Sequence, residues 1–280
     1  MVLPLKTLLG QTSPLIAPLA YDGISARLVR EFGFRAAYIG SYAVSATKYG
    51  VADIGFVGLE DMADTVRRIA PVVDVPVIVD GEGGFGNPIH VARTVQVLER
   101  AGASATHIED HVFGKHLGVP RVIPVEQAVD KIKAALDARK SEDFLIIGRS
   151  DALLSEGEDA TIDRLLAYQE AGADALFLAR TPKPGEVLNE RLRKEARVPI
   201  LMTNGPGYSA AELGEQGADI VLYPTLNNFV AESSMRKALE RLAHEGSSVG
   251  IEEDYEAFDI FLGADEYRST ALELGLLTQS

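Results

Sequence analysis

The sequence predicts a (β/α)₈ barrel, and three observations lead to that fold class. Eight short runs of apolar and β-branched residues recur along the chain. Most of them are followed by a turn and then by a segment with apolar residues at three- and four-residue spacing, the pattern of an amphipathic helix. The runs lie between residues 14 and 224, and a barrel of this kind typically takes about 250 residues. Apolar strands that alternate with amphipathic helices indicate parallel βαβ units.

The predicted strands are rich in Val, Ile, Leu, Ala and Phe. Near-continuous apolar runs of this length are typical of strands that are buried on both faces of a parallel sheet. The alternative architecture is a doubly wound open sheet, but eight regular repeats suit a closed barrel better. The eight predicted strands are residues 14–20, 36–41, 75–81, 105–110, 144–151, 175–180, 198–204 and 219–224.

Seven helices are predicted between and after these strands. Several of them end in Ala-Gly or Gly, the favoured stop signal of a helix. Residues 1–246 then form a catalytic barrel domain. The acidic segment 251–277 indicates one or two further helices in a C-terminal extension, residues 247–280, which cap the barrel or reach a neighbouring subunit. The seven predicted helices are residues 24–33, 59–73, 89–102, 124–139, 161–172, 210–217 and 232–246.

Charge and composition exclude several classes of partner. The chain has 27 Lys and Arg against 41 Asp and Glu, a net charge of −14, and an acidic protein attracts neither nucleic acid nor an anionic membrane. A small anionic substrate then needs neutralisation by a metal ion or an arginine. The chain has no cysteine, which excludes disulfides and cysteine nucleophiles. Residues 1–23 show no signal peptide, and no apolar run reaches the roughly 18 residues of a membrane span, so we expect a cytoplasmic protein.

Polar side chains gather where the predicted strands end, which is where a barrel of this kind has its active site. The segment VPVIVDGEGGFGN, Val75 to Asn87, shows this clearly: an apolar run ends in Asp80 and Glu82, where burying a charge is costly unless it meets a cation. The strand-end residues are Tyr21, Asp22, Gly40, Ser41, Tyr42, Asp80, Glu82, Glu109, Asp110, Arg149, Asp151, Arg180, Thr203, Asn204 and Tyr223.

The acidic strand ends indicate a metal site. Carboxylates in a chain without Cys and with few His suit a hard cation, Mg²⁺ or Mn²⁺. Mg²⁺ usually keeps several waters, so Asp80, Glu82 and Glu109 need not all bind it directly. Arg149 can grip a substrate carboxylate with two hydrogen bonds. A metal that chelates an α-oxo acid stabilises enolate charge, which points to carbon–carbon or carbon–phosphorus chemistry next to a carbonyl.

Each of these features also has a structural interpretation. Asp-x-Glu at a strand end is often a turn or a helix N-cap, and the glycines of GGFGN can serve a tight corner instead of a phosphate. Arg149 can pair with Asp151 or Asp80. His107, on an apolar strand, is expected to be a hydrogen-bonded core residue rather than a ligand.

Five segments resemble one family. They are YDGISARLVREFGFRAAYIGSYAVSAT, PVIVDGEGGFGN, ARTVQVLERAGASATHIED, IIGRSDAL and YQEAGADALF, and they are similar to the isocitrate lyase/phosphoenolpyruvate mutase superfamily. The resemblance runs from about Leu15 to Gly246, and it is nearest to the shorter members, 2-methylisocitrate lyase, oxaloacetate decarboxylase and phosphonopyruvate-processing enzymes. It implies a (β/α)₈ barrel, Mg²⁺, an α-oxo carboxylate or its enolate as substrate, and a homotetramer that swaps C-terminal helices.

The resemblance also implies the metal ligands and a residue at the reacting group. Asp80 matches the principal metal-binding aspartate, and Glu109 matches a glutamate of the metal shell. Glu82 stands where the family usually has a second Asp, so its extra methylene is expected to shift or tilt the metal. Asp53 matches the aspartate near the reacting group.

The implied substrate-binding residues come from several strand ends. Gly40, Ser41 and Tyr42 match the loop that holds the substrate carboxylate, and Arg149 matches the substrate-binding arginine. Asparagine after the seventh strand is displaced or replaced, so two neighbouring residues are candidates. The full set expected to bind substrate is Tyr21, Gly40, Ser41, Tyr42, Arg149, Arg180, Thr203 and Asn204, and the expected catalytic residues are Asp53, Lys115 and Arg149.

The sequence departs from the family on the mobile loop. The lyases carry Lys-x-Cys-Gly-His there, and the Cys protonates the departing enolate. In this chain the stretch reads GKHLGV: Lys115 and Gly118 remain, Leu117 replaces Cys and Val119 replaces His. A leucine cannot transfer a proton, so cleavage of the 2-methylisocitrate type is not expected. A later family glutamate is replaced by Ala179, with Arg180 next to it.

Three functions follow. The first is a Mg²⁺-dependent lyase or decarboxylase that cleaves a C–C bond next to the carbonyl of a small 2-oxo or 2-hydroxy dicarboxylate through a metal-stabilised enolate. Solvent can protonate that enolate, and Arg180 adds a charge for a second carboxylate or a phosphonate. The second is a phosphonopyruvate or carboxyphosphonoenolpyruvate mutase or hydrolase. The third is a non-catalytic binding or scaffold protein.

Overall fold

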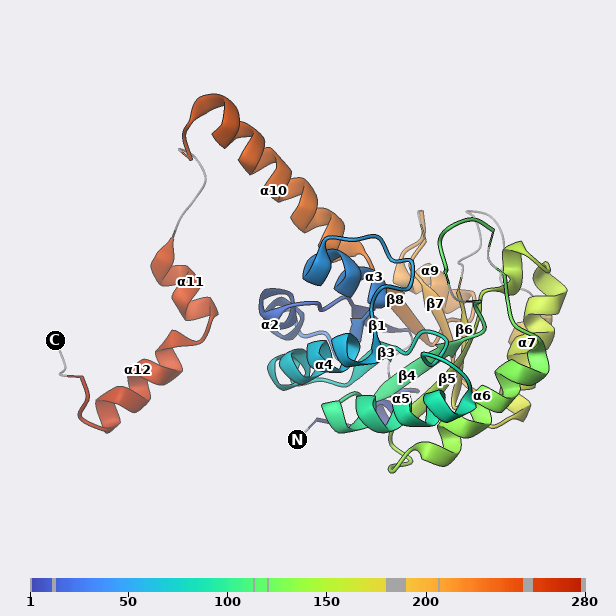
Figure 1. Cartoon of the computed structure of the whole chain (residues 1–280). Coiled ribbons are helices and arrows are strands. Elements are labelled where there is room, and N and C mark those ends of the chain that lie inside the picture. Colours follow the sequence, from blue (N-terminus) through green and yellow to red (C-terminus); the bar gives the residue numbers. More distant parts are fainter. Residues whose placement is uncertain are drawn as a thin grey trace. The chain divides into compact units, whose positions relative to one another are not determined.

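The computed structural model describes residues 2–11, 14–112, 114–119, 121–179, 190–205, 207–248 and 254–277. The chain divides into two compact units, residues 1–227 and 228–280. The first unit contains all the described strands, and the second consists of helices (Figure 1).

The first unit is a (β/α)₈ barrel, which confirms the predicted fold class. Its eight strands are parallel and are ordered β1-β8-β7-β6-β5-β4-β3-β2. The ring closes between β1 and β2, where Leu19 bridges Tyr38 and the backbone N–H of Ala20 donates to the Tyr38 carbonyl at 2.8 Å. The strands are β1 (Leu15–Pro18), β2 (Ala37–Ile39), β3 (Val77–Asp80), β4 (Ala105–Glu109), β5 (Leu145–Ser150), β6 (Ala175–Leu178), β7 (Ile200–Thr203) and β8 (Ile220–Tyr223).

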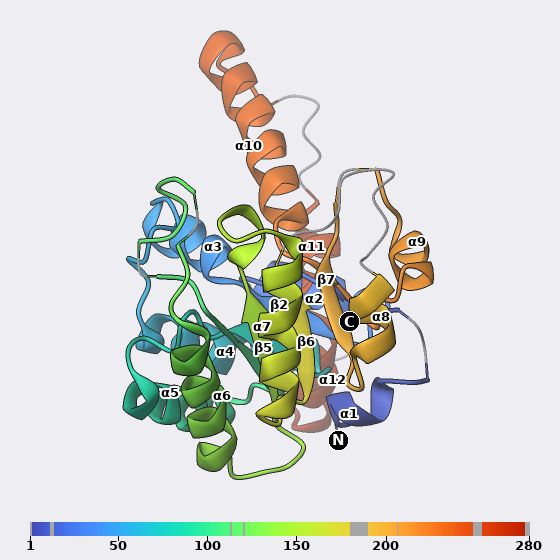
Figure 2. The same cartoon turned by 90° about the vertical axis from the view of Figure 1, so that its right-hand side faces the viewer.

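Helices surround the strands on the outside (Figure 2). All seven predicted helices are present, with ends that shift by a few residues. Three short helices were not predicted: α1 (Leu5–Leu8), α3 (Ser41–Val44), which continues into a π-helical turn at Ser45–Tyr49, and α8 (Glu190–Glu195). These are too short to show an apolar period. Six of the predicted helices lie in this unit: α2 (Gly23–Glu31), α4 (Leu59–Val73), α5 (Pro88–Ala101), α6 (Val125–Ala138), α7 (Glu158–Glu170) and α9 (Ala210–Glu215).

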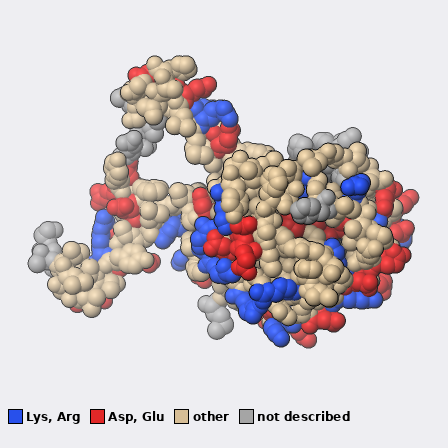
Figure 3. Space-filling model, viewed as in Figure 1, with Lys and Arg blue, Asp and Glu red and all other residues tan. Residues whose placement is uncertain are grey.

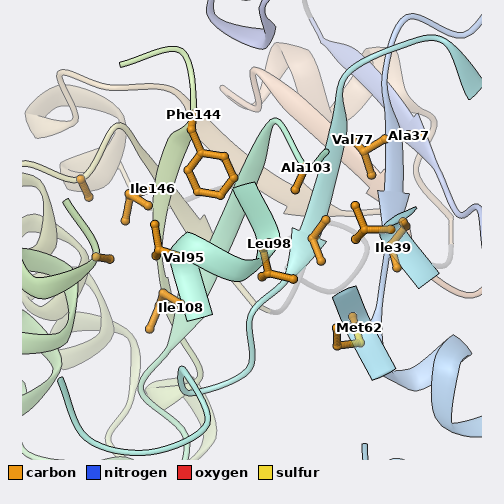
Figure 4. Close-up of a cluster of buried hydrophobic side chains, with 14 of the residues drawn as sticks. Ala37, Ile39, Met62, Val77, Val95, Leu98, Ala103, Ile108, Phe144 and Ile146 are labelled. Atoms are coloured by element: carbon orange, nitrogen blue, oxygen red, sulfur yellow. The ribbon is translucent and has the colours of Figure 1, made fainter. Parts of the chain in front are cut away.

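The core has two layers, because successive side chains of a strand point to opposite faces. One layer lies between strands and helices: Val77 and Val79 of β3 pack there with residues of α4 and α5, such as Met62 and Leu98 (Figure 4). The other layer fills the barrel interior and includes Ile78 of the same strand.

The inner layer fixes where the functional side chains point. Ile78 faces the interior, so Asp80, two residues further along β3, faces the interior as well. The same alternation puts Glu109 of β4 inside, and it puts Arg149 of β5 inside after Ile147. In the sheet, Glu109 pairs in register with Arg149.

At the opposite end of the barrel, α1 contributes to the interior. Leu5 and Leu8 are buried and belong to the same cluster as Leu15 and Ile220. The first helix therefore closes the end of the barrel that lies away from the acidic strand ends.

The second unit contains most of α10 (Leu226–Glu245) together with α11 (Tyr255–Phe261) and α12 (Ala264–Glu273). The sequence predicted one or two helices in the tail, and its described residues form two. No described residue of these three helices is buried. Among the described residues, no helix is long and apolar enough to cross a membrane.

Candidate active site

The turn after β3 starts the site. Gly81 follows Asp80, and a Cβ at Gly81 would lie 2.6 Å from Thr106 Oγ1 and 2.7 Å from the His107 carbonyl. Only glycine fits this approach between β3 and β4. Glu82 then adopts a left-handed backbone conformation, with φ of 51°, which is uncommon for a residue with a side chain. Its N–H donates to Asp80 Oδ1 at 2.8 Å, and its carbonyl accepts from the Glu109 N–H at 2.9 Å.

The glycines of GGFGN serve this turn and the start of the next helix. Gly84 and Gly86 have φ of 79° and 150°, and a Cβ at Gly84 would collide with Val91. Asn87 then caps α5, its Oδ1 accepting from the N–H of Ile89 at 3.0 Å. The described contacts therefore support the structural interpretation of this motif.

Four acidic side chains surround the ammonium group of Lys115. Lys115 Nζ lies 2.6 Å from Glu82 Oε1, 3.3 Å from Asp53 Oδ2, 3.9 Å from Glu109 Oε1 and 4.0 Å from Asp80 Oδ2. All five side chains are buried or nearly so. We call these five residues the acidic cluster.

Ser41 joins the cluster at the start of α3. Its hydroxyl lies 3.0 Å from Asp80 Oδ2 and 3.3 Å from Asp53 Oδ2, and it accepts a hydrogen bond from Lys115 Nζ at 3.0 Å. Gly40, before it, packs against the Tyr38 ring, where a Cβ would lie 2.8 Å from Cε1. The close approach of backbone and ring explains the glycine at this strand end.

Arg149 borders the acidic cluster. Its Nε and Nη2 each donate to Asp151 at 2.9 Å, and its Nη1 lies 3.1 Å from Glu109 Oε2 and 3.9 Å from Asp80 Oδ2. The guanidinium lies over the Phe177 ring, 5.3 Å from its centroid. Arg149 therefore pairs with Asp151, one of the two partners that the sequence suggested. Its Nη1 is the guanidinium nitrogen that faces the acidic cluster.

A buried hydrogen-bond network around Asp110 fixes the backbone of Asp151. The side chain of Asp110 accepts hydrogen bonds from Ser150 Oγ at 2.7 Å, from Tyr168 Oη at 2.8 Å and from the N–H of Asp151 at 2.9 Å. Arg164 Nη1 lies 3.5 Å from the same carboxylate. Burial raises the pKa of Asp110. The sequence placed Asp110 at a strand end but gave it no role.

His107 lies beneath Asp80 as a core residue, in line with the structural interpretation. It is fully buried, its Nε2 is 3.1 Å from Tyr38 Oη, and its ring meets Phe177 edge-on. Burial lowers the pKa of His107 to about 4, so the imidazole is neutral at pH 7. Tyr38, His107 and Phe177 form an uncharged floor under the cluster.

The carboxyl groups of the cluster differ in acidity. Burial opposes ionisation of Asp80, but the nearby charge of Lys115 holds its pKa well below the usual range. Burial raises the pKa of Glu109 well above its ordinary value, and burial together with the charge of Asp80 raises the pKa of Glu82. The pKa of Lys115 is raised because the surrounding carboxylates outweigh the effect of burial.

Charge balance in the site favours a further cation. Among the described residues, two Lys or Arg side chains, Lys115 and Arg149, lie within 4.0 Å of Asp151 and the four acids of the cluster. Two buried oxygens, Asp53 Oδ1 and Glu109 Oε2, make no hydrogen bond with the described residues. Glu109 Oε2 still has an ion-pair contact, because Arg149 Nη1 lies 3.1 Å from it. The donor set consists of carboxylate oxygens, which suit Mg²⁺ or Mn²⁺. In the described part of the chain, no group of three His or acidic residues has the arrangement of a metal site. The Lys115 ammonium group lies among the four acids of the cluster instead.

Other predicted residues lie around the same end of the barrel. Tyr21 follows β1 and packs partly on the inner layer, Tyr42 is partly exposed in α3, Thr203 ends β7 and Asn204 follows it. The Asn204 N–H donates to the Leu222 carbonyl at 2.8 Å. Arg180, predicted to bind a second anionic group, lies outside the described residues.

Two neighbouring residues were missed. His116 Nε2 lies 3.4 Å from Asp53 Oδ2, and its backbone φ is 65°. Lys131, on α6, donates to the carbonyl of Gly83 at 2.7 Å. His116 adjoins Lys115 in the sequence, which was a usable signal. Lys131 sits at an ordinary helix position, and nothing in its sequence context pointed to the site.

A cavity of about 460 Å³ opens beside the cluster. Glu82, Glu109 and Lys115 line one side, and apolar side chains such as Phe56 and Phe85 line another. This volume suits a small molecule.

On the barrel surface shown in Figure 3, acidic and basic side chains are intermingled.

Comparison with known proteins places the chain in a family. The model of the phosphoenolpyruvate phosphomutase family matches residues 5–243. The chain belongs to the isocitrate lyase/phosphoenolpyruvate mutase superfamily. This confirms the resemblance seen in the sequence.

Similar proteins include enzymes with related names. The chain is 33% identical over 270 residues to 2,3-dimethylmalate lyase of Eubacterium barkeri, covering 92% of this chain and 91% of the relative. It is 38% identical over 197 residues to oxaloacetate decarboxylase of Rhodopseudomonas palustris, covering 70% and 66%. The structure of phosphonopyruvate hydrolase with oxalate and Mg²⁺ has a TM-score of 0.87 at 28% identity, over 96% of this chain and 97% of the other. The lyase and the decarboxylase among these relatives support an enzyme of the carbon–carbon lyase type.

Proposed function

We propose that this enzyme cleaves a C–C bond next to the carbonyl of a small 2-oxo or 2-hydroxy dicarboxylate, with Mg²⁺ or Mn²⁺ as cofactor. The observation that carries the proposal is the buried excess of acid: five carboxyl groups face two cationic side chains at the mouth of the barrel. Unpaired buried charge is costly, and a divalent cation would offset the excess of acid.

Asp80, Glu82 and Glu109 would hold the metal, mostly through water molecules, because Mg²⁺ keeps much of its hydration. When bound, Mg²⁺ acts as a Lewis acid that stabilises negative charge on the oxygen next to the reacting carbon. The raised pKa values of Glu82 and Glu109 mean that metal binding competes with protons at these two groups.

The anionic substrate would be held by the cationic and polar groups around the cluster. Arg149 keeps its orientation through Asp151 and presents Nη1 toward a substrate carboxylate. The other substrate-binding residues of the proposal are Tyr21, Gly40, Ser41, Tyr42, Thr203, Asn204 and, outside the described residues, Arg180.

Proton transfer would involve Asp53. Its Oδ1 is buried and has no hydrogen-bond partner in the described part of the chain, so it can accept the proton of a substrate hydroxyl. Leu117 is 73% exposed and carries no ionisable group, so the enolate takes its proton from solvent. Lys115 supplies positive charge to the site from the segment of residues 114–119.

Phosphorus chemistry is the second candidate, because phosphonopyruvate hydrolase has a closely similar structure and Leu117 cannot replace a loop cysteine. Pyruvate release with Mg²⁺ separates the two. Oxaloacetate, 2-alkylmalates, 2-methylisocitrate and phosphonopyruvate are offered in parallel, with EDTA controls and with Asp80→Asn as the matched variant.

We expect EDTA-sensitive release from oxaloacetate or an alkylmalate, and none from Asp80→Asn. Pyruvate release from phosphonopyruvate alone, or conversion of phosphonopyruvate into another phosphorus compound seen by phosphorus NMR, would replace the proposal with carbon–phosphorus chemistry. No release and no binding of oxalate, an enolate mimic, would favour the non-catalytic alternative.

The proposal includes a cytoplasmic homotetramer. The described part of residues 228–280 buries no side chain while exposing large apolar ones, among them Phe229, Met235, Leu239 and Tyr267. A second copy of the chain is the occupant we propose for these faces. Light scattering after size-exclusion chromatography tests it: a monomer would contradict this part of the proposal.

A further inference from the structure

Lys115 occupies the place that the proposed metal would need. Its Nζ lies between 2.6 and 4.0 Å from one oxygen of each of the three proposed metal-binding residues, Asp80, Glu82 and Glu109. Its side chain is only 4% exposed. A Mg²⁺ ion bound by the same carboxylates, directly or through water, would lie within a few ångströms of this point.

An ammonium group and a divalent cation exclude each other there. Both are attracted by the same oxygens, and at such short separation in a buried site their repulsion is strong. The carboxylates can be neutralised by the lysine or by the metal, and the transition between the two states requires Nζ to move away.

The segment that carries Lys115 is built to allow that movement. Within residues 114–119, Lys115 is the only buried residue, and Leu117 and Val119 are 73% and 70% exposed. Gly114 and Gly118 flank it, and a Cβ at either would meet nothing within 4 Å. The contacts of Lys115 with the acidic cluster and Ser41, together with the 3.4 Å contact between His116 Nε2 and Asp53 Oδ2, therefore anchor the segment.

We propose that Lys115 sets the metal affinity of the site by acting as an internal cation that the divalent ion must displace. This inference rests on the proposed function, because it takes Mg²⁺ as the ligand. Metal binding then releases residues 114–119, and by linkage the anchored segment weakens metal binding by the same factor. The displaced ammonium becomes available to an anionic substrate that arrives after the metal.

The first test is metal binding to the full-length protein, with Mn²⁺ as the probe and electron paramagnetic resonance as the readout. Lys115→Met removes the charge and keeps the apolar stem. We expect it to bind Mn²⁺ more tightly than the wild type by about tenfold or more, within the usual range of coupling between sites.

Lys131→Met is the matched control. It also removes one lysine charge beside the same cavity, but Lys131 donates to a carbonyl, that of Gly83. Its effect should be much smaller than that of Lys115→Met. Equal Mn²⁺ affinity in the wild type and Lys115→Met, or an equal gain in Lys131→Met, would overturn the inference while leaving the proposed function intact. Failure of the wild type and both folded variants to bind Mn²⁺ would overturn the metal in the proposed function as well.

The second test uses the wild-type protein and does not depend on a variant that folds. Trypsin cleaves after lysine, and the peptide bond between Lys115 and His116 is protected while Lys115 is buried. We expect Mg²⁺ to accelerate cleavage at this bond and EDTA to suppress it, as followed by mass spectrometry. Cleavage that is unchanged or slowed at saturating Mg²⁺ would contradict displacement.

Discussion

Arg149 and Asp151 are joined by two hydrogen bonds of 2.9 Å each, from Nε and from Nη2 to the two carboxylate oxygens. This bidentate pair fixes the guanidinium plane and leaves Nη1 directed at Glu109. The pair lies beside the acidic cluster, so Asp151 acts as a positioning residue for an arginine that would otherwise have several rotamers.

Replacing Arg149 by Lys tests whether its positive charge alone is sufficient or whether the planar guanidinium group is needed. Arg149→Lys keeps the positive charge but cannot hold Asp151 and a substrate carboxylate at the same time. We expect KM to rise by about 10- to 100-fold, the loss of one charged hydrogen bond, with a smaller change in kcat. Steady-state kinetics on the substrate identified in the panel measure this. Asp151→Asn is the companion variant, and an unchanged KM in both would contradict the assignment.

The close approach at Gly81 predicts a loss of stability. Gly81→Ala places a Cβ within 3 Å of Thr106, of the His107 carbonyl and of Ile108. Overpacking of this kind costs about 1–3 kcal/mol in the free energy of unfolding, which urea denaturation measures. Gly23→Ala is the control, because nothing lies within 4 Å of a Cβ there. Equal stability of the two variants would contradict the steric argument.

The buried network predicts an effect on both stability and substrate binding. Asp110→Asn puts an amide donor where the carboxylate accepts from Ser150, Tyr168 and the Asp151 backbone. We expect a loss of about 1–3 kcal/mol from the donors left unsatisfied, and a raised KM because Asp151 loses its support. Tyr168→Phe removes one donor and is expected to lower stability without the change in KM. The same KM shift in both variants would argue against positioning.

The acidic cluster predicts how stability depends on pH. Glu82 and Glu109 have pKa values above the ordinary 4.5, so the folded state binds their protons more tightly than the unfolded state does. Their contribution to stability is complete below about pH 4.5 and is lost as pH rises through the raised values. The lowered pKa of Asp80 acts in the opposite sense and only near and below pH 3.8.

The metal-free protein should therefore lose stability as the pH rises above about 4.5, the ordinary pKa of a glutamate, and Mg²⁺ should restore more of it at higher pH, where its ligands are ionised. Thermal midpoints with Mg²⁺ and with EDTA across this range measure the effect. Stabilisation by Mg²⁺ that is independent of pH would contradict the assignment of Glu82 and Glu109 as metal ligands.

The barrel was predictable because its signal is repeated. The strand from Val77 to Asp80 and its seven counterparts are mostly buried and rich in apolar residues, and no single uncertain segment could change the fold class. Short elements escaped prediction for the opposite reason: α8 buries only Leu192, and one apolar residue defines no period.

The membership of the site was predictable only in part. Strand-end position identified Asp80, Glu109 and Arg149, because alternation along a strand decides which residues face the interior. It could not reveal that Lys115 reaches into their midst, since that depends on the path of a loop. Nor could it show that His116 meets Asp53, a contact between residues 63 positions apart that no periodicity encodes.

The alternation that puts Ile78 in the barrel interior puts Asp80 there as well, and this ties the chemistry to the fold. A one-residue insertion in β3 before Ile78 would turn both side chains outward, which removes Ile78 from the barrel interior and Asp80 from the acidic cluster in a single step. A change in strand length by one residue is therefore expected to disrupt both the core and the site. Substrate preference can change with less disturbance of the barrel in segments such as 55–58 and 114–115, which border the cavity without belonging to a strand.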